Sequence, residues 1–570
     1  MERPWIAHYE AHVPPALDIP DTPLADCLRR NARRFPKRSA LIFFGARLSF
    51  AALNDAVDRF AAGLQKLGVA PGDRVALFMP NCPQYAIAYF AAWRIGAIVV
   101  PCNPLYVARE IEHQLQDAGA RVAVVLSSFY PLLRQVRANT PLREVIVANI
   151  KEYFPPPLRA AFTVLKEKSE GHYVELDGES DTYWFQDVLR TATAVPAPVR
   201  VSLDDTACLL YTGGTTGVPK GAELTHGNLL VNAMQCQIWL ETRTAQETVL
   251  AALPFSHSYG MTTGLNHGIY AAATLVLIPN PRDLKFVLTN IARYRPTFFP
   301  GVPTIYVAIN NYRDIAKYDL SSIRACISGG AGLPLEVQRR FERLTGGKLV
   351  EGYGLTECSP VTHANPVYSG CRLGTIGLPW PGTDCRLVDV EDGEREVAPG
   401  EPGELCIRGP QVMKGYWNRP DETAAVLRGG WLHTGDIAVM DEDGYFRIVD
   451  RKKDMIIAGG YNIYPRDIEE VLYEHPKVQE AVAVGIPHPY RGETAKAYVV
   501  LKAGESVGED ELIRWCRGRL AKYKVPTAIE FRDELPKSMV GKVLRRVLRE
   551  QEIERQAQGT AGAPPAAHST

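Results

Sequence analysis

The sequence has no excess of charge of either sign: its 570 residues contain 64 lysines and arginines and 64 aspartates and glutamates. Nucleic-acid-binding proteins usually carry a basic excess, so this balance argues against nucleic acid as a partner. Hydrophobic residues make up 46% and charged residues 22% of the chain, which is ordinary for a soluble globular protein. A chain of this length is too long for one hydrophobic core, and we therefore expect at least two domains.

The sequence also lacks paired cysteines, a targeting signal and a long uninterrupted apolar run. Its eleven cysteines form no CxxC pair and their number is odd, which indicates free thiols in a reducing compartment and not a disulfide or zinc framework. The N-terminus shows no basic stretch followed by an apolar one. The most apolar stretch, residues 86–105, contains Arg94 and is broken at Pro101, so it predicts a helix followed by a strand. We expect a cytoplasmic protein, with peripheral contact at the inner face of the membrane left open.

A segment rich in glycine and threonine, Tyr211–Gly221, is the most informative stretch that is present. It follows the apolar run 207–210, which predicts a strand leading into a loop. Glycines let backbone N–H groups approach a phosphate, threonine hydroxyls add donors, and Lys220 adds positive charge. The segment is not a Walker A loop, because Pro219 precedes the lysine and Gly221 follows it. Taken alone, it is equally typical of a plain glycine-rich turn.

Further motifs follow this segment in a fixed order. They are EGYGLTE at 351–357, WLHTGD at 431–436, IVDRKKD at 448–454, GGYN at 459–462 and PKSMVGKVLRR at 536–546. Their order and spacing resemble the adenylate-forming superfamily, which includes acyl-CoA synthetases, peptide-synthetase adenylation domains and luciferases. The resemblance covers roughly residues 20–550 and is strongest to the long-chain fatty acid–CoA ligases, above all at 351–360, 280–283 and 459–465.

Helix-like and strand-like stretches alternate along the first 440 residues, for example strands at 74–79 and 121–126, which predicts an α/β fold with mostly parallel sheets. Strands near 481–485 and 495–501 and a helix over 511–522 predict a small α+β domain. The resemblance implies a large N-terminal region of several subdomains. The expected domains are an N-terminal adenylate-forming domain over 1–449, a mobile C-terminal domain over 450–556 and a disordered tail, rich in Ala, Gly and Pro, over 557–570.

Residues 153–178 interrupt the alternation and read as a partly exposed insertion. Their mixture of basic and apolar side chains is compatible with contact to a membrane surface. A solvated excursion is the more common explanation of such a stretch.

The resemblance implies an acid–thiol ligase that works in two half-reactions. A carboxylate attacks the α-phosphorus of MgATP to give acyl-AMP and pyrophosphate, and the coenzyme A thiol then attacks the acyl-AMP. ATP, Mg²⁺ and coenzyme A are thus implied, with a fatty acid as substrate. One alternative is a fatty acyl-AMP ligase that loads an acyl carrier protein; such enzymes often carry an insertion that is not apparent between 436 and 468. Another is an adenylate-binding protein without catalysis. The sequence leaves open the preferred acyl chain length, whether the acid is aliphatic or aromatic, and whether the protein forms a homodimer.

The resemblance also assigns the groups that handle phosphate and metal. The implied phosphate-binding residues are Thr212, Gly213, Gly214, Thr215, Thr216, Gly217 and Lys220. Lys542 is the implied adenylation lysine, which donates to both the carboxylate and the α-phosphate. Thr356 would donate to the α-phosphate, and Glu357 with Thr216 would coordinate Mg²⁺ through hard oxygens. Alone, a Thr-Glu pair is more typical of a capped helix start.

Nucleotide, coenzyme A and acyl contacts complete the implied site. The nucleotide-contacting residues are Gly329, Gly330, Ala331, Tyr353, Gly354, Asp436, Ile448 and Arg451, and the coenzyme A-facing ones are Gly459 and Gly460. Asp450 is the implied hinge, about which the small domain rotates between half-reactions. His257, as a further catalytic candidate, Gly301 and Val302 would border the acyl site, where a glycine leaves space for a long chain. A lone histidine is about as often a buried structural residue.

Overall fold

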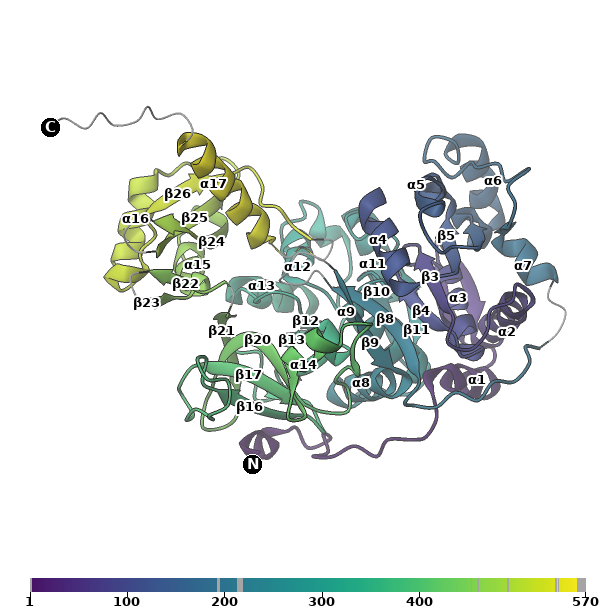
Figure 1. The fold of residues 1–570 in the computed structure, drawn as a ribbon, viewed down its shortest axis with the longest axis horizontal. Helices are drawn as coiled ribbons and strands as arrows, with labels where there is room; N and C mark the ends of the chain where they lie inside the picture. The colour runs from purple at the N-terminus through teal and green to yellow at the C-terminus, as the bar shows by residue number, and fades with distance from the viewer. Residues whose placement is uncertain are drawn as a thin grey trace. The chain divides into compact units, whose positions relative to one another are not determined.

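The computed structural model describes residues 3–191, 195–212, 219–452, 454–458, 461–488, 492–538, 541 and 543–560. The chain forms two compact units (Figure 1). Unit 1 comprises Met1–Cys385, Ile407–His433 and Asp443–Tyr445, and unit 2 comprises Arg386–Cys406, Thr434–Glu442 and Phe446–Thr570. Unit 2 therefore takes in three stretches that precede the expected boundary at residue 450, namely 386–406, 434–442 and 446–449. The position of that boundary stays a prediction.

An eight-stranded sheet in unit 1 carries the glycine-rich segment. Its strands, in spatial order, are β18 (Gly415–Tyr416), β9 (Lys220–Thr225), β8 (Thr206–Thr212), β4 (Ile98–Pro101), β3 (Arg74–Phe78), β5 (Val122–Leu126), β6 (Glu144–Ala148) and β7 (Thr182–Trp184). From β8 to β7 neighbouring strands run parallel, whereas β9 pairs antiparallel with both β8 and β18. The expected α/β class and the expected strands at 74–79 and 121–126 are confirmed.

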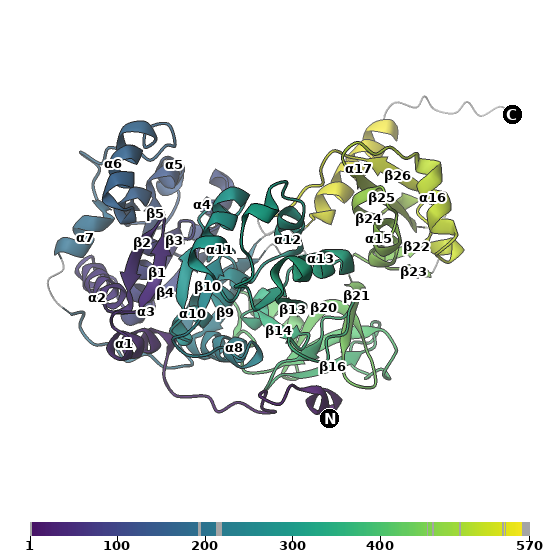
Figure 2. The same ribbon diagram turned by 180° about the vertical axis from the view of Figure 1, so that it is seen from behind.

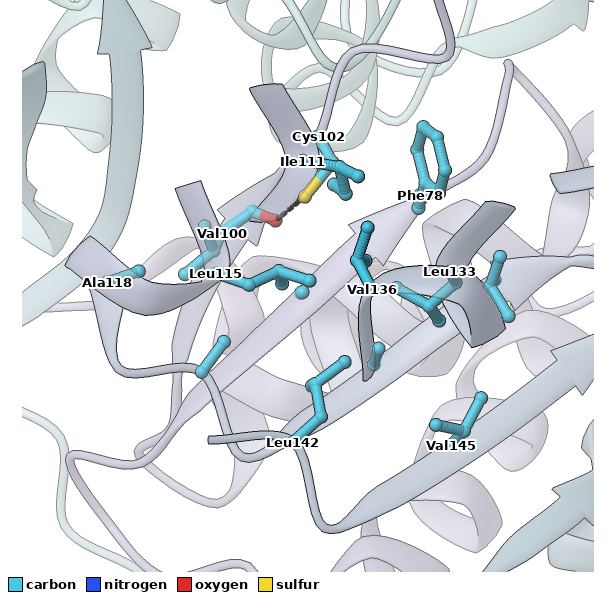
Figure 3. Packing of buried hydrophobic residues seen from close by; sticks show 14 of the residues in the cluster. Phe78, Val100, Cys102, Ile111, Leu115, Ala118, Leu133, Val136, Leu142 and Val145 are labelled. Carbon is cyan, nitrogen blue, oxygen red and sulfur yellow. Dashed lines mark hydrogen bonds between the residues drawn. The ribbon is translucent and has the colours of Figure 1, made fainter. Parts of the chain in front are cut away.

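Apolar packing against one face of this sheet fixes the strands in place (Figure 3). Side chains of α4 (Ala108–Ala118) and α5 (Tyr130–Arg137), such as Leu115 and Leu133, meet Phe78 of β3 and Val145 of β6. Strands of a parallel sheet that is covered by helices read as nearly continuous apolar runs, as β5 does. This rigid core holds β8, and with it the start of the glycine-rich segment.

Unit 1 also contains two smaller sheets. The first is ordered β10 (Thr248–Ala251), β11 (Thr274–Leu277), β1 (Ser39–Phe43), β2 (Ala46–Ser49), and the second β12 (Ala325–Ser328), β13 (Lys348–Gly354), β14 (Val361–Ala364), β15 (Leu378–Pro379). Strands β12 and β13 are parallel and in register at Ser328 and Glu351. Residues 329–331 follow β12 directly, whereas β13 continues for three residues past this register to Gly354, after which residues 355–357 follow.

The helices of unit 1 connect and cover these sheets. In addition to α4 and α5 they are α1 (Leu24–Arg34), α2 (Phe50–Lys66), α3 (Pro83–Arg94), α6 (Pro156–Leu165), α7 (Phe185–Thr191), α8 (His226–Trp239), α9 (Ser258–Gly260), α10 (His267–Tyr270), α11 (Leu284–Tyr294), α12 (Pro303–Asn310), α13 (Leu335–Thr345) and α14 (Pro420–Val426). Helices α1, α8 and α10 pack together (Figure 2). The apolar stretch 86–105 forms the buried helix α3 followed by β4, as expected. Among the described residues, no helix has the length and apolar content needed to cross a membrane.

Unit 2 contains a further sheet with its own core. The sheet is ordered β23 (Tyr461–Ile463), β22 (Ile456–Ala458), β25 (Gly492–Leu501), β24 (Val478–His488), with β26 (Ala528–Phe531) pairing with β25. The other elements that fall in this unit in whole or in part are β16 (Asp384–Val388), β17 (Gly403–Arg408), β20 (Trp431–Met440), β21 (Phe446–Arg451), α15 (Pro465–Tyr473), α16 (Glu509–Arg517) and α17 (Arg545–Thr560). Apolar residues of α15, α16 and the sheet form one core, which confirms the expected α+β arrangement.

Two expected boundaries in this unit differ from the structure. Helix α16 ends at Arg517 and not at residue 522, because Gly518 follows and glycine is a poor helix former; residues 522–524 form a separate 3₁₀ turn. Helix α17 continues to Thr560, past the expected start of the disordered tail at residue 557. Residues 561–570 lie outside the described part of the chain.

Candidate active site

The β8–β9 hairpin brings the two ends of the glycine-rich segment together. Thr212 is the last residue of β8, Lys220 is the first residue of β9, and the two are paired in antiparallel register. The expected strand before the loop is thereby confirmed. The intervening candidates Gly213, Gly214, Thr215, Thr216 and Gly217 lie outside the described residues.

The ammonium group of Lys220 is largely buried and has two partners. Its side chain is 13% exposed, and its Nζ forms an ion pair with the carboxylate of Glu422 on α14. On another side, Nζ lies 5.0 Å from the centre of the Tyr416 ring, in the geometry of a cation–π contact. Tyr416 reaches this position because β18 pairs with β9, opposite Ala222.

Tyr416 also contacts the candidate metal ligand. Its hydroxyl donates a hydrogen bond of 2.8 Å to Oε1 of Glu357, and the backbone N–H of Met413 donates to the Glu357 carbonyl at 2.7 Å. Burial and the adjacent Glu357 carboxylate raise the pKa of Tyr416, so its hydroxyl keeps its proton and remains a donor. The structure thus places Lys220 and Glu357, far apart in the sequence, against one tyrosine side chain.

Thr356 lies next to the segment that carries His257. The hydroxyls of Thr356 and Ser258 are 3.3 Å apart, at hydrogen-bonding distance. His257 precedes α9, and its Nδ1 accepts the N–H of Tyr259 at 3.2 Å, so the imidazole acts as a helix cap. Thr356, a candidate for phosphate binding, and His257, a candidate for the acyl site, therefore both lie beside Ser258.

The glycines after β12 make room for close packing. Gly330 has φ +82°, which favours glycine, and a Cβ at Gly329 would lie 3.0 Å from the ring of Tyr259. A Cβ at Gly330 would lie 3.7 Å from the side chain of Val302. Ala331 follows directly in the same turn. The adenine and acyl candidates of the sequence are thus neighbours in unit 1.

Packing around Gly301 gives this position a structural reason to be glycine. A Cβ at this position would come within 2.6 Å of the Tyr306 hydroxyl, which donates to the carbonyl of Phe299. The Tyr306 side chain therefore fills the space on the Cβ side of Gly301, and the expectation that this glycine leaves room for an acyl chain stays a prediction. Its backbone N–H donates to the Ile327 carbonyl at 3.2 Å, which keeps it beside β12.

Tyr353 and Gly354 end β13 and lead into Thr356. The Tyr353 ring packs edge-on against His363 with ring centres 5.8 Å apart, and burial lowers the pKa of His363 to about 3, so that imidazole is neutral. A Cβ at Gly354 would lie 2.1 Å from the carbonyl oxygen of Pro360, which excludes any other residue without movement of the backbone. This close approach fixes the turn that presents Thr356 and Glu357.

The candidates for ribose contact lie in unit 2. Asp436 of β20 and Arg451 of β21 are paired in register, and Arg451 Nε lies 3.0 Å from Asp436 Oδ1. The carbonyl of Ile448 accepts a hydrogen bond from Arg466. The two charged candidates are therefore adjacent, which suits binding of neighbouring hydroxyls. The candidates Gly459, Gly460 and Lys542 lie outside the described residues.

Asp450, the candidate hinge, is buried and held by several groups of unit 2. Its carboxylate accepts the backbone N–H of Arg451 at 2.7 Å and that of Arg466 at 2.9 Å. Arg545 Nη1 lies 3.7 Å away, and the same guanidinium contacts Asp454 at 3.5 Å and Glu469 at 2.7 Å. Burial raises the pKa of Asp450 to about 6, against the opposing effect of Arg545.

Sequence reasoning missed Tyr416 and Glu422. Both lie in residues 415–426, where Pro420 and the acidic residues after it signal a helix start. That signal predicts α14, but it does not reveal that β18 pairs with β9, which is the step that brings Tyr416 and Glu422 to Lys220.

The sequence matches known families and proteins over nearly its whole length. The AMP-binding enzyme family matches residues 28–417, and the AMP-binding enzyme C-terminal domain matches residues 467–542. The long-chain-fatty-acid–CoA ligase of Bacillus subtilis (strain 168) is 46% identical, across 97% of this chain and 99% of the relative. The protein of the same description from Escherichia coli O157:H7 is 43% identical, across 97% and 98%. Among solved structures, that of the anthranilate CoA ligase AuaEII in complex with anthranoyl-AMP is similar with a TM-score of 0.83 at 28% identity, across 95% of this chain and 99% of that one.

Proposed function

Because the chain belongs to the AMP-binding enzyme family, we propose that it activates a long-chain fatty acid with ATP and transfers the acyl group to coenzyme A. The acyl-CoA synthetases of this family form an acyl-AMP first and a thioester second, with ATP, Mg²⁺ and coenzyme A. The observation that carries the proposal is the shared contact of Lys220 and Glu357 with Tyr416. A cation for phosphate and a hard carboxylate for a metal are held in one place, as joining two anions requires.

The groups around Glu357 fit Mg²⁺. This ion is usually bound by one or two protein carboxylates together with substrate phosphates and water. Glu357 offers a half-buried carboxylate whose orientation is fixed by the Tyr416 hydroxyl. Bound there, with Thr216 as a second ligand, Mg²⁺ would screen the charge of the phosphates.

The residues of this chain then divide the work of the first half-reaction. Lys220 would neutralise the β- and γ-phosphates, and Thr356 would donate to the α-phosphate. Lys542 would donate to the attacking carboxylate and the α-phosphate together, which lowers the repulsion between the two anions. Asp436 and Arg451 would bind the ribose, and Tyr353 would lie against adenine.

In the second half-reaction the small domain would have a different orientation. We propose rotation about Asp450, which removes Lys542 and brings Gly459 and Gly460 to the thiol. The polar anchoring of the Asp450 carboxylate by two backbone N–H groups supports a fixed pivot.

An acid panel tests the substrate. The measurement is AMP release for acids from acetate to oleate and for anthranilate and benzoate, with and without coenzyme A. We expect the highest kcat/KM for long-chain acids, because each buried CH₂ contributes about 0.8 kcal/mol, and AMP release that depends on coenzyme A. A preference for acetate or an aromatic acid would overturn the fatty acid assignment. Turnover with an acyl carrier protein and not with coenzyme A would support the acyl-AMP ligase alternative.

We further propose a cytoplasmic location with peripheral contact to an anionic membrane surface through α6. This helix, PPLRAAFTVL, has one buried residue, Phe162, and exposes Val164 by 81% and Leu165 by 74%. It contains no acidic residue and carries Arg159. Lys168 follows it, together with Glu167, which is buried, and Lys166, which pairs with Glu170. Apolar side chains flanked by cations suit the boundary between lipid headgroups and chains. The insertion predicted at 153–178 is therefore anchored by Phe162 but largely exposed.

Vesicle binding tests this surface. Val164→Asp together with Leu165→Asp should lower partitioning to phosphatidylglycerol vesicles by about tenfold or more, since two exposed apolar side chains of this size contribute a few kcal/mol when buried. The matched control is Leu373→Asp, another exposed leucine of unit 1. Unchanged partitioning in the double variant would contradict the proposal. A dimer that the same variant dissociates would instead make α6 a contact between copies of the chain.

A further inference from the structure

Glu422 is the anionic partner of Lys220 in this structure. The Glu422 carboxylate and the Lys220 ammonium form an ion pair in which the lysine is largely buried and the glutamate is 37% exposed. The Tyr416 ring packs against the same ammonium. The cation proposed to bind polyphosphate thus has a counter-ion of its own within the protein, supplied by α14.

Glu422 has a second cation that remains when Lys220 changes partner. Arg419 Nε lies 3.7 Å from Glu422 Oε1, and Arg419 Nη2 lies 2.7 Å from Asp117 Oδ1. The hydroxyl of Tyr211, on β8 next to Thr212, donates to the other oxygen of Asp117 at 2.7 Å. Removing one partner of a partly buried ion pair is costly only if the other charge is left uncompensated. Arg419 compensates Glu422, so the exchange of Lys220 onto a phosphate leaves no isolated charge.

We propose that Glu422 is a displaceable counter-ion of Lys220, which competes with ATP and with pyrophosphate for the ammonium and so promotes the release of pyrophosphate. The inference rests on the phosphate-binding role proposed for Lys220. Both polyphosphates must displace the same carboxylate, so both bind more weakly than they would to a free lysine. The apparent Kd rises by the inverse of the fraction of time in which Lys220 is unpaired.

Glu422→Gln isolates this competition, because it keeps the shape of the side chain and removes its charge. We expect titration calorimetry with Mg²⁺-pyrophosphate and with ATP to show binding that is about two- to fivefold tighter than in the unaltered protein, the size typical of a partly exposed ion pair. Pyrophosphate should also inhibit AMP formation at correspondingly lower concentration. The matched control is Asp421→Asn, on the same turn of α14 and exposed, which makes the same change in net charge beside the site.

A double variant separates the contact from a general charge effect. In a Lys220→Ala background, Glu422→Gln should no longer alter pyrophosphate binding, because the ammonium group for which Glu422 and pyrophosphate compete is absent. An equal gain in that background, or a gain of the same size in Asp421→Asn, would overturn the proposal. So would unchanged or weaker pyrophosphate binding in Glu422→Gln.

Two further measurements keep the outcome decisive. Glu422→Asp retains the charge but shortens the side chain, and should give affinity between those of the unaltered protein and Glu422→Gln; this variant replaces Glu422→Gln if thermal unfolding shows the latter to be misfolded. If the unaltered protein binds neither ATP nor pyrophosphate, the proposed function fails. If it binds both and the glutamate variants bind them equally, the counter-ion role alone fails.

Discussion

Tyr416 is the residue through which a lysine of the hairpin and a glutamate of another strand–turn segment are held together. Its hydroxyl has one acceptor, Oε1 of Glu357, and its ring faces Lys220. Tyr416→Phe would keep the ring contact and remove the hydrogen bond. We expect the adenylation rate at low free Mg²⁺ to fall about tenfold, because a hydrogen bond to a charged group contributes roughly 1.5–3 kcal/mol and the site is partly open to solvent.

The dependence of the adenylation rate on Mg²⁺ concentration checks this prediction. Saturating Mg²⁺ should restore most of the rate, since the metal itself then orients the carboxylate. Tyr368→Phe is a suitable control, because its hydroxyl donates to the carbonyl of Leu240 and not to a carboxylate. A Mg²⁺ profile of Tyr416→Phe that coincides with that of the control would contradict the assigned role.

Asp450 gives the folded protein a dependence on pH at the same scale. Its pKa is raised from 3.8 to about 6 by burial, so between these values the folded state binds more protons than the unfolded state. Stability therefore falls as pH rises from about 4 to about 6 and is constant with respect to this group above that range. Asp450→Asn removes the effect, and its stability relative to the unaltered protein should increase across this window by up to about 3 kcal/mol. Denaturant unfolding on both sides of the window measures this; a difference that does not vary with pH would show that Asp450 ionises normally.

At the scale of elements, the sequence predicted most of the framework because local signals were strong. Local sequence alone predicts the apolar strands β3 and β5. It also predicts α3 and β4 from the broken apolar stretch that forms them. Tyr416 and Glu422 could not be assigned in this way, since their role depends on β18 pairing with β9. The reason for Gly301 was missed for the same cause: only the packed structure shows that the Tyr306 hydroxyl lies against it.

The turn between β13 and β14 yields a prediction at this scale. Gly354→Ala would place a methyl group against the Pro360 carbonyl, which is backbone and cannot rotate away. We expect a loss of about 1–3 kcal/mol in stability, together with a loss of adenylation greater than instability explains, because Thr356 and Glu357 follow in the displaced turn. Gly508→Ala, where a Cβ meets nothing within 4 Å, is the control. Activity and melting temperature of Gly354→Ala equal to those of the control would show that the turn adapts.

For the whole molecule, the order of motifs along the chain predicted the family, but the sequence could not assign which unit each strand joins. Apart from Lys542, which lies outside the described residues, the candidates for phosphate and acyl binding fall in unit 1, and Asp436, Ile448, Asp450 and Arg451 fall in unit 2. Stretches 386–406, 434–442 and 446–449 precede the expected boundary at residue 450 yet belong to unit 2.

The division of labour between half-reactions is tested at this scale. Lys542→Ala should lower acyl-AMP formation roughly 10²–10³-fold, the usual cost of losing one donor at developing charge, and should still convert supplied acyl-AMP and coenzyme A to acyl-CoA.

Asp450→Pro should show the opposite pattern, with pyrophosphate release in a single turnover and little acyl-CoA, because proline fixes φ and removes a backbone donor at the pivot. Rapid-quench assays of each step compare the two variants. Equal loss of both steps in either variant would refute separate roles.

Ten of the eleven cysteines are buried, and Cys371, in unit 1, is the exposed one. The native protein therefore already has a single exposed cysteine that a thiol-reactive dye can label. The substitution Glu505→Cys, on the exposed turn after β25, would supply a second labelling site in unit 2. Energy transfer between the two dyes would then test, one molecule at a time, the rotation proposed for the small domain, without replacing any of the buried thiols.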